Sequence, residues 1–95
     1  MAESGAKIVT NHLIITNKAG LHMRPAQALA SEMNTFSSEI TILHGGKTIN
    51  AKSMLELMAA CLHCGAHITL VCEGSDEQAA LEAARRLLTS DFGAP

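Results

Sequence analysis

The sequence predicts an α+β fold: an open-faced two-layer sandwich in which a four-stranded antiparallel sheet is covered on one face by three helices. Four stretches rich in β-branched or apolar residues predict strands, and three others predict helices, in the order β-α-β-β-α-β-α. The pair Gly45-Gly46 joins the second and third strand-like stretches, which is typical of a tight hairpin. Two serine-headed capping boxes open the second and third helices and so mark the same order independently.

Length and composition favour one domain with an aliphatic core. The chain has 95 residues, of which 47% are hydrophobic and only 2% aromatic. The core must therefore be built from Leu, Ile, Ala, Val and Met, which suits helices packed on a sheet. We expect a single domain over residues 1–95 with an ordered core over about 7–90, because only the two ends lack a pattern.

The first half of the chain predicts a strand, a helix and a hairpin. Residues 7–16, KIVTNHLIIT, are rich in β-branched residues and predict a strand, with NKAG as the following turn. Residues 37–52 predict the two short strands of the hairpin. Residues 24–36 between them predict a helix, because their apolar residues share one face: Ala26, Leu29, Ala30 and Met33.

The second half predicts a helix, a strand and a last helix. An S-x-x-E capping box at residues 53–56 opens a helix that runs to about Leu62 and is stopped at Gly65. Residues 66–74, AHITLVCEG, predict the fourth strand. A second capping box, at residues 75–78, opens the last helix.

Charge and hydropathy exclude two classes of partner. The formal net charge is −2, and the few cations are scattered rather than arranged in a stripe, which argues against a nucleic-acid partner. The apolar stretches fall short of the roughly 20 residues that a membrane span needs, and no targeting segment is recognisable. We therefore expect a soluble, cytoplasmic protein without membrane insertion.

The three cysteines are expected to be reduced, since they cannot all pair and a chain able to bury a core needs no disulfide. Cys61 is expected on the apolar face of the second helix, and Cys72 in the fourth strand as a small hydrophobe. Cys61 and Cys64 form a C-x-x-C, and with His67 they offer a metal or redox alternative. A structural zinc site normally uses two ligand pairs in tight loops, so we expect no metal and no cofactor.

The segment GLHMRP, residues 20–25, gathers chemically active residues at the start of the first helix. Pro25 fits the first turn, where its missing N–H costs nothing, and a helix N-terminus attracts anions. His22, when neutral, offers one ring nitrogen as a nucleophile, and Arg24 offers a charged donor fork that recognises phosphate. The arrangement favours reversible phosphoryl transfer onto the imidazole. The alternative is that His22 caps the helix and Arg24 is a solvated charge.

Three motifs resemble one family, the histidine-containing phosphocarrier HPr of the bacterial phosphotransferase system. GLHMRPAQALASEM resembles its active-site segment, whose motif is G-[LIM]-H-x-R-P-A. FSSEITILHGGKTINAKSMLELM resembles its hairpin and serine-headed helix, and GAHITLVCEGSDEQAALEAARRLL its last strand and helix. The resemblance covers roughly residues 8–89 without large gaps and implies an HPr-like sandwich.

The resemblance also implies roles for individual residues. His22 would accept the phosphoryl group, Arg24 would stabilise it, and Gly20 and Pro25 would shape the turn. Phosphate would reach His22 from phosphoenolpyruvate through enzyme I and pass to IIA proteins for sugar uptake and regulation, without independent turnover of a small molecule. Both partners must dock around the histidine, and the adaptable apolar side chains expected there are Met23, Met54, Leu55 and Met58.

Ser53 matches the serine that HPr kinase/phosphorylase modifies in many members, although it is equally explained as an N-cap. Two alternatives to the sugar-uptake carrier stay open. One is a nitrogen-type HPr in a regulatory phosphorelay, to which the tail LLTSDFG is similar; the other is a regulatory docking module switched by phosphorylation of Ser53. The remaining histidines are expected to be ordinary surface or satisfied polar residues: His12, His44, His63 and His67.

Overall fold

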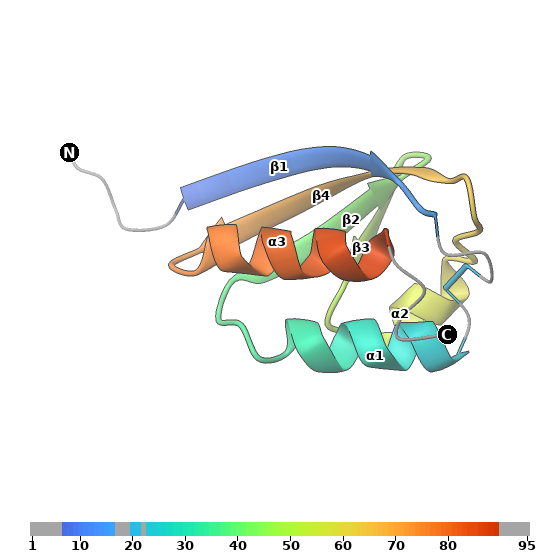
Figure 1. The fold of residues 1–95 in the computed structure, drawn as a ribbon, viewed down its shortest axis with the longest axis horizontal. Coiled ribbons are helices and arrows are strands. Elements are labelled where there is room, and N and C mark those ends of the chain that lie inside the picture. Colours follow the sequence, from blue (N-terminus) through green and yellow to red (C-terminus); the bar gives the residue numbers. More distant parts are fainter. Residues whose placement is uncertain (1–6, 17–19, 22, 90–95) are drawn as a thin grey trace.

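The computed structural model describes residues 7–16, 20–21 and 23–89, and it confirms the predicted order of elements (Figure 1). The elements are β1 (Lys7–Ile14), α1 (Met23–Met33), β2 (Glu39–His44), β3 (Lys47–Asn50), α2 (Met54–Ala59), β4 (His67–Gly74) and α3 (Glu77–Leu88). No helix within these described ranges is long and apolar enough to cross a membrane.

The sheet is antiparallel throughout, with strand order β1-β4-β2-β3, and the helices lie on one of its faces (Figure 1). Cys72 in β4 stands opposite Val9 on one side and Ile40 on the other. The last strand therefore lies between the first strand and the hairpin. This arrangement confirms the open-faced sandwich that the sequence predicts.

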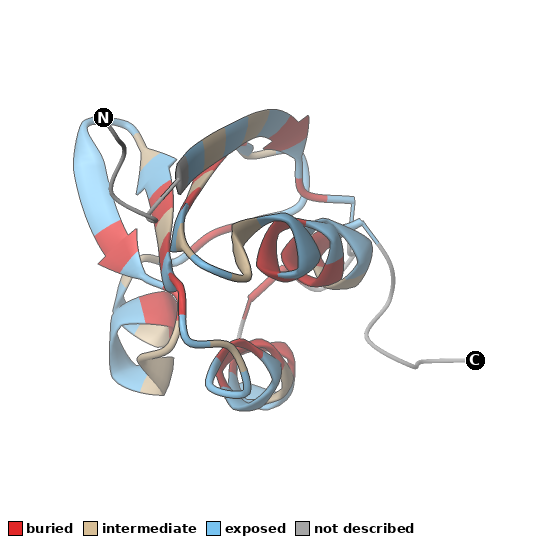
Figure 2. Cartoon of the chain, turned by 90° about the vertical axis from the view of Figure 1, so that its left-hand side faces the viewer, coloured by how far each residue is buried: buried red, intermediate tan, exposed pale blue. Residues whose placement is uncertain are grey.

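The core lies between the sheet and the helices, where the buried residues of both layers face one another (Figure 2). Along β1 the side chains of Thr10 and His12 are exposed while Leu13 is buried, as expected for a sheet with one open face. The face that α1 buries carries Pro25 together with the four predicted residues: Ala26, Leu29, Ala30 and Met33.

The hairpin is confirmed in detail. Gly45 and Gly46 both have positive φ, 56° and 82°, and His44 pairs with Lys47 on either side of them. A two-residue connection with positive φ at both positions matches the right-handed twist of the strands, and glycine adopts it with little strain.

The second helix is shorter than predicted, and the prediction that it runs to about Leu62 is wrong. It ends at Ala59 with Ala60 as its C-cap, and Cys61 follows in the left-handed region with φ 53°. Because the chain leaves the helix there, Leu62 reaches the core with 1% of its surface exposed. Cys61 is exposed, so its expected place on an apolar helix face is also wrong; Cys72 is buried as predicted.

The first capping box is confirmed at its serine, but the second is not formed. Ser53 Oγ accepts a hydrogen bond from the Glu56 N–H at 3.2 Å. The last helix begins after Asp76 rather than after Ser75, and no side chain caps it. The Asp76 carboxylate instead accepts from the backbone N–H groups of Ser37 and Ser38, both at 2.9 Å, and from the Ser38 hydroxyl.

Candidate functional site

The candidate site lies at the end of the molecule where the chain enters α1. His22 lies outside the described residues, and the structure fixes the chain on both sides of it. Leu21 is buried, and Met23 opens α1 with 59% of its surface exposed. The position of His22 is therefore bounded by one residue anchored in the core and one facing solvent.

Gly20 and Leu21 are held against the loop that follows α2. The Leu21 N–H donates to the Leu62 carbonyl oxygen at 2.8 Å. Gly20 has φ 72°, and a Cβ at this position would lie 2.6 Å from the same oxygen and 3.1 Å from His63 Cα. Both the backbone angle and the close approach require glycine here, as expected for a residue that shapes the turn.

The loop after α2, residues 61–66, supports this segment along its whole described course. The Gly65 N–H donates to the Ile15 carbonyl at 2.8 Å, and the Ile15 N–H donates to the Ala66 carbonyl at 3.0 Å. The Cys64 Sγ lies 3.9 Å from the Thr16 carbonyl oxygen as a weak donor. We call residues 61–66 the supporting loop, because they bind the chain at both ends of the stretch from Ile15 to Leu21.

The first turn of α1 presents a cation on the surface. Arg24 is exposed, and the described residues include no ion-pair partner for it. The first turn contains no acidic side chain, and Pro25 is buried in it. A guanidinium that is not engaged by a carboxylate is available to bind a phosphate oxygen, and the N-terminus of the helix favours the same charge.

The four residues predicted to form the docking face differ in exposure. Met23 and Leu55 are exposed, Leu55 to 80%. Met54 and Met58 are partly buried and pack against the core. Since α1 packs against α2, the two exposed side chains extend from neighbouring helices.

Ser53 is engaged in local hydrogen bonds. Its hydroxyl caps α2, and the Glu56 carboxylate accepts from the Asn50 N–H at 2.8 Å. The serine side chain is partly buried. A phosphoryl group on Ser53 would therefore replace the capping hydroxyl and place negative charge near Glu56.

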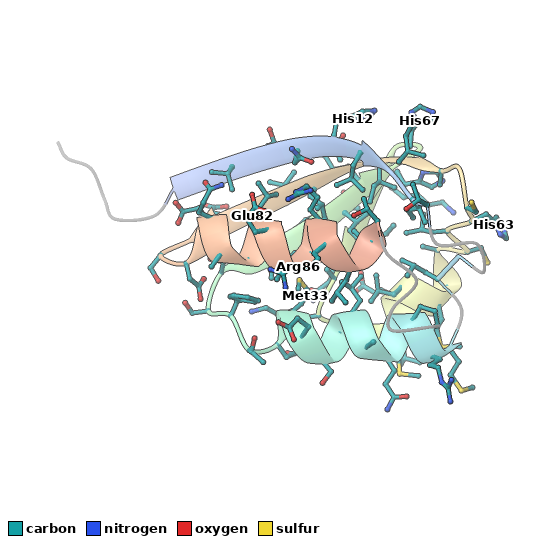
Figure 3. The ribbon with its side chains drawn as sticks, viewed as in Figure 1. His12, Met33, His63, His67, Glu82 and Arg86 are labelled. Atoms are coloured by element: carbon teal, nitrogen blue, oxygen red, sulfur yellow. The ribbon has the colours of Figure 1, made fainter. Side chains whose placement is uncertain are left out.

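Figure 3 shows His12 and His67 on the open face of the sheet, the face away from the helices, and His63 in the supporting loop. The rings of His12 and His67 are 5.8 Å apart, and His44 Nδ1 lies 3.1 Å from the His67 carbonyl oxygen. His63 is exposed between the two cysteines of the supporting loop. Within the described part of the chain, no three His, Cys, Asp or Glu residues are grouped so that they could hold a metal ion.

The supporting loop is the part of the site that the sequence analysis missed. Its contacts join residues more than 40 positions apart, such as Leu21 and Leu62. No periodicity or spacing in the sequence indicates such a pairing, and the residues that make it act mostly through backbone atoms. Only the folded chain brings the two segments together.

The chain matches the family described as "PTS HPr component phosphorylation site" over residues 9–90. It is 45% identical to the HPr-like protein Crh of Halalkalibacterium halodurans, covering 80% of this chain and 90% of that one. It is 43% identical to the phosphocarrier protein HPr of Mycoplasma capricolum, covering 79% and 84%. The crystal structure of an HPr from Bacillus anthracis superposes with a TM-score of 0.83 at 38% identity, covering 86% of this chain and 98% of that one.

Proposed function

Because this chain belongs to the HPr family of phosphotransferase-system phosphocarriers, we propose that it carries a phosphoryl group on His22. In this proposal His22 accepts the group from phospho-enzyme I, which is charged by phosphoenolpyruvate, and passes it to IIA proteins in the cytoplasm. The observation that carries the proposal is the exposed Arg24, which has no ion-pair partner within the described ranges, in the acid-free first turn of α1, two residues after the histidine.

The chemistry needs few groups from this chain. A ring nitrogen of His22 attacks phosphorus as the bond from phosphorus to the donor breaks, and the reverse step delivers the group to the acceptor. Charge accumulates on the phosphoryl oxygens in both directions. Arg24 and the N-terminal backbone of α1 supply positive potential there without a proton transfer. Such an arrangement supports transfer in either direction and does not require turnover of a small molecule.

Enzyme I and IIA proteins would both dock on the surface around His22. Met23 and Leu55 support this role, because large apolar side chains that are more than half exposed contribute little to the stability of the free chain and bury area in a complex. Met54 and Met58 would support that surface from below, since they pack on the core.

A regulatory role for Ser53 is a second candidate, favoured by its position at the start of α2. An HPr kinase/phosphorylase would add a group to the oxygen that now accepts from the Glu56 N–H. The added charge would lie on the helix that also carries Leu55. It would oppose docking of an acidic partner without altering His22 itself.

The test is intact-mass spectrometry at alkaline pH after incubation with phosphoenolpyruvate and an enzyme I. We expect the mass of one phosphoryl group, removed by acid and absent from the His22→Ala variant. His12→Ala is the matched control, because it removes an exposed imidazole from the open sheet face and should still accept phosphate. Uptake of phosphate by His22→Ala would contradict the proposal.

A further inference from the structure

Cys61 and Cys64 carry chemistry that the proposed phosphocarrier does not use. Both are free thiols exposed to solvent, three positions apart in the supporting loop. The third cysteine, Cys72, is buried in β4 and is therefore inaccessible to solvent. Burial also raises its pKa to about 11, which keeps the thiol protonated. An oxidant in solution therefore meets one pair of thiols.

Each of the two thiols donates to a different backbone carbonyl. Cys61 Sγ lies 3.8 Å from the Met58 carbonyl oxygen, and Cys64 Sγ lies 3.9 Å from that of Thr16. A disulfide has no S–H group, so oxidation removes both contacts whatever geometry the product adopts. Of these two contacts, the one at Thr16 joins the supporting loop to the start of the segment leading to Gly20, beside the backbone bonds that Gly65 and Ala66 make with Ile15.

A bridge between the two cysteines also requires the loop to bend. Disulfides form when the Cα atoms lie within roughly 7 Å, which residues three positions apart reach only if the chain turns between them. No hydrogen-bonded turn spans Cys61 to Cys64: one turn ends at Cys61, whose N–H donates to the Met58 carbonyl, and the next begins at His63, whose carbonyl accepts from Ala66. Bending there displaces the Leu62 carbonyl, which accepts the hydrogen bond from Leu21 directly before His22.

The backbone of Cys61 adds a separate indication. Its φ of 53° is the only positive value at a non-glycine residue in the described part of the chain. A side chain in this region is strained, and such strain concentrates at positions that switch or act. The backbone of the supporting loop is therefore strained at Cys61, one of the two residues that the bridge would join.

We infer that Cys61 and Cys64 form a site of reversible oxidation by low-molecular-weight disulfides, and that the Cys61–Cys64 bridge slows phosphoryl transfer to His22. The effect on transfer rests on the proposed function. One protein thiolate attacks the small disulfide, forming a mixed disulfide as one small thiolate leaves. The second protein thiolate then attacks the mixed disulfide and releases the other. Two protein thiols lose two electrons and two protons, and one small disulfide becomes two thiols.

The experiment uses the full chain, treated with oxidised glutathione and then freed of it. Intact mass and peptide mapping without reductant show whether the bridge forms, and this readout does not depend on phosphate. The rate of phosphate acceptance from phosphoenolpyruvate and enzyme I is then compared for the reduced and oxidised forms. The controls are Cys64→Ser, which keeps a donor to the Thr16 carbonyl, and Cys61→Gly, which suits the positive φ.

We expect a bridged chain that accepts phosphate roughly 2- to 10-fold more slowly, the loss expected when the Leu21 hydrogen bond is broken, with the rate restored by dithiothreitol. Neither control should respond to oxidised glutathione in this way. Failure to form the bridge, or an unchanged rate in the bridged chain, overturns the inference. A reduced chain that accepts no phosphate overturns the proposed function and the coupling with it, while the mass alone still decides whether the thiol pair is oxidised.

Discussion

Asp76 and Arg24 are charged residues at opposite ends of the molecule, and they differ in whether other groups of the chain bind their charge. Figure 1 shows that α3, which follows Asp76, begins at one end of the sheet, whereas α1, which contains Arg24, begins at the other. Asp76 accepts two backbone N–H groups and the hydroxyl of Ser38, a residue that is fully buried. Arg24 is exposed and has no ion-pair partner among the described residues.

The difference separates a structural end from the end at which we propose that phosphate is transferred. We call Ser37, Ser38 and Asp76 the carboxylate clamp. In the clamp, the hydrogen bonds of the Asp76 carboxylate hold two loops together, so this charge stabilises the fold and cannot bind a ligand. At the site end the chain is held mainly by backbone hydrogen bonds, such as that from Leu21 to Leu62, which leaves the side chains free. Substitutions in the clamp should therefore affect stability, whereas substitutions of exposed side chains at the other end should affect phosphate transfer.

Gly20→Ala should have the largest effect, because this residue belongs to the support of the site and not to its chemistry. The added Cβ meets the Leu62 carbonyl at 2.6 Å in a left-handed backbone. We expect the free energy of unfolding to fall by about 2–4 kcal/mol, and phosphate acceptance to fall as well. Urea unfolding measures the first and the intact-mass assay the second.

Gly45→Ala is the matched control for this prediction. Its φ is also positive, at 56°, but a Cβ there meets nothing within 4 Å. It should cost only the backbone strain, about 1–2 kcal/mol, and leave phosphate acceptance unchanged. Equal destabilisation by the two variants would show that the close approach of Gly20 to Leu62 contributes nothing to the difference in the free energy of unfolding.

Arg24→Ala should have the next largest effect, and only on function. Loss of a charge-assisted hydrogen bond of about 1.5–3 kcal/mol slows phosphate acceptance by roughly 10- to 100-fold. The free energy of unfolding should change by less than about 0.5 kcal/mol, because the side chain is exposed. The control is Arg86→Ala, an exposed arginine on α3. If both variants transfer phosphate at the wild-type rate, Arg24 has no part in the site.

Ser53→Ala should have a smaller effect, and on stability alone. The variant leaves the Glu56 N–H without its capping oxygen and should lower the free energy of unfolding by about 1 kcal/mol. Ser53→Asp retains a capping acceptor, so its free energy of unfolding should fall by less. Its charge should nevertheless weaken docking of an acidic partner. A stable Ser53→Asp variant that binds enzyme I and IIA proteins as the wild type does would remove the regulatory candidate.

Acid should act on the carboxylate clamp, with no effect near neutral pH. The hydroxyl of Ser38 and the backbone N–H of Ser37 lower the pKa of Asp76 from 3.8 to about 2. A carboxyl group whose pKa is lowered on folding contributes stability at pH values above its ordinary pKa. That contribution is lost as the pH falls from about 4 through about 2. Urea unfolding at each pH should show a steeper loss for the wild type than for Asp76→Asn. Identical slopes would contradict this account of the clamp.

The sequence could predict most of the fold because its signals are local. The alternation along β1, the glycine pair of the hairpin and the apolar face of α1 are each set by neighbouring residues. The end of α2 could not be predicted, since the chain leaves the helix to bury Leu62 and to present its carbonyl to Leu21. Helical propensity alone would have continued the helix.

The start of α3 shows the same limit. Ser75 and Asp76 are both good N-cap residues, and local preference cannot choose between them. The choice depends on Ser37 and Ser38, whose N–H groups reach the Asp76 carboxylate from a loop 38 or 39 residues earlier in the chain. At the candidate site, the GLHMRP segment is proposed from its residue types, whereas the supporting loop beneath it could not be predicted from the sequence.

The most direct test of the central claim is an NMR measurement on a chain labelled with ¹⁵N in its five histidines. Spectra are recorded before and after incubation with phosphoenolpyruvate and enzyme I. We expect the ring nitrogens of His22 alone to show the shift and phosphorus coupling of a new P–N bond, with His12, His44, His63 and His67 unchanged. A P–N bond on any of these four, or on none of the five, would contradict the assignment of His22 as the phosphoryl acceptor.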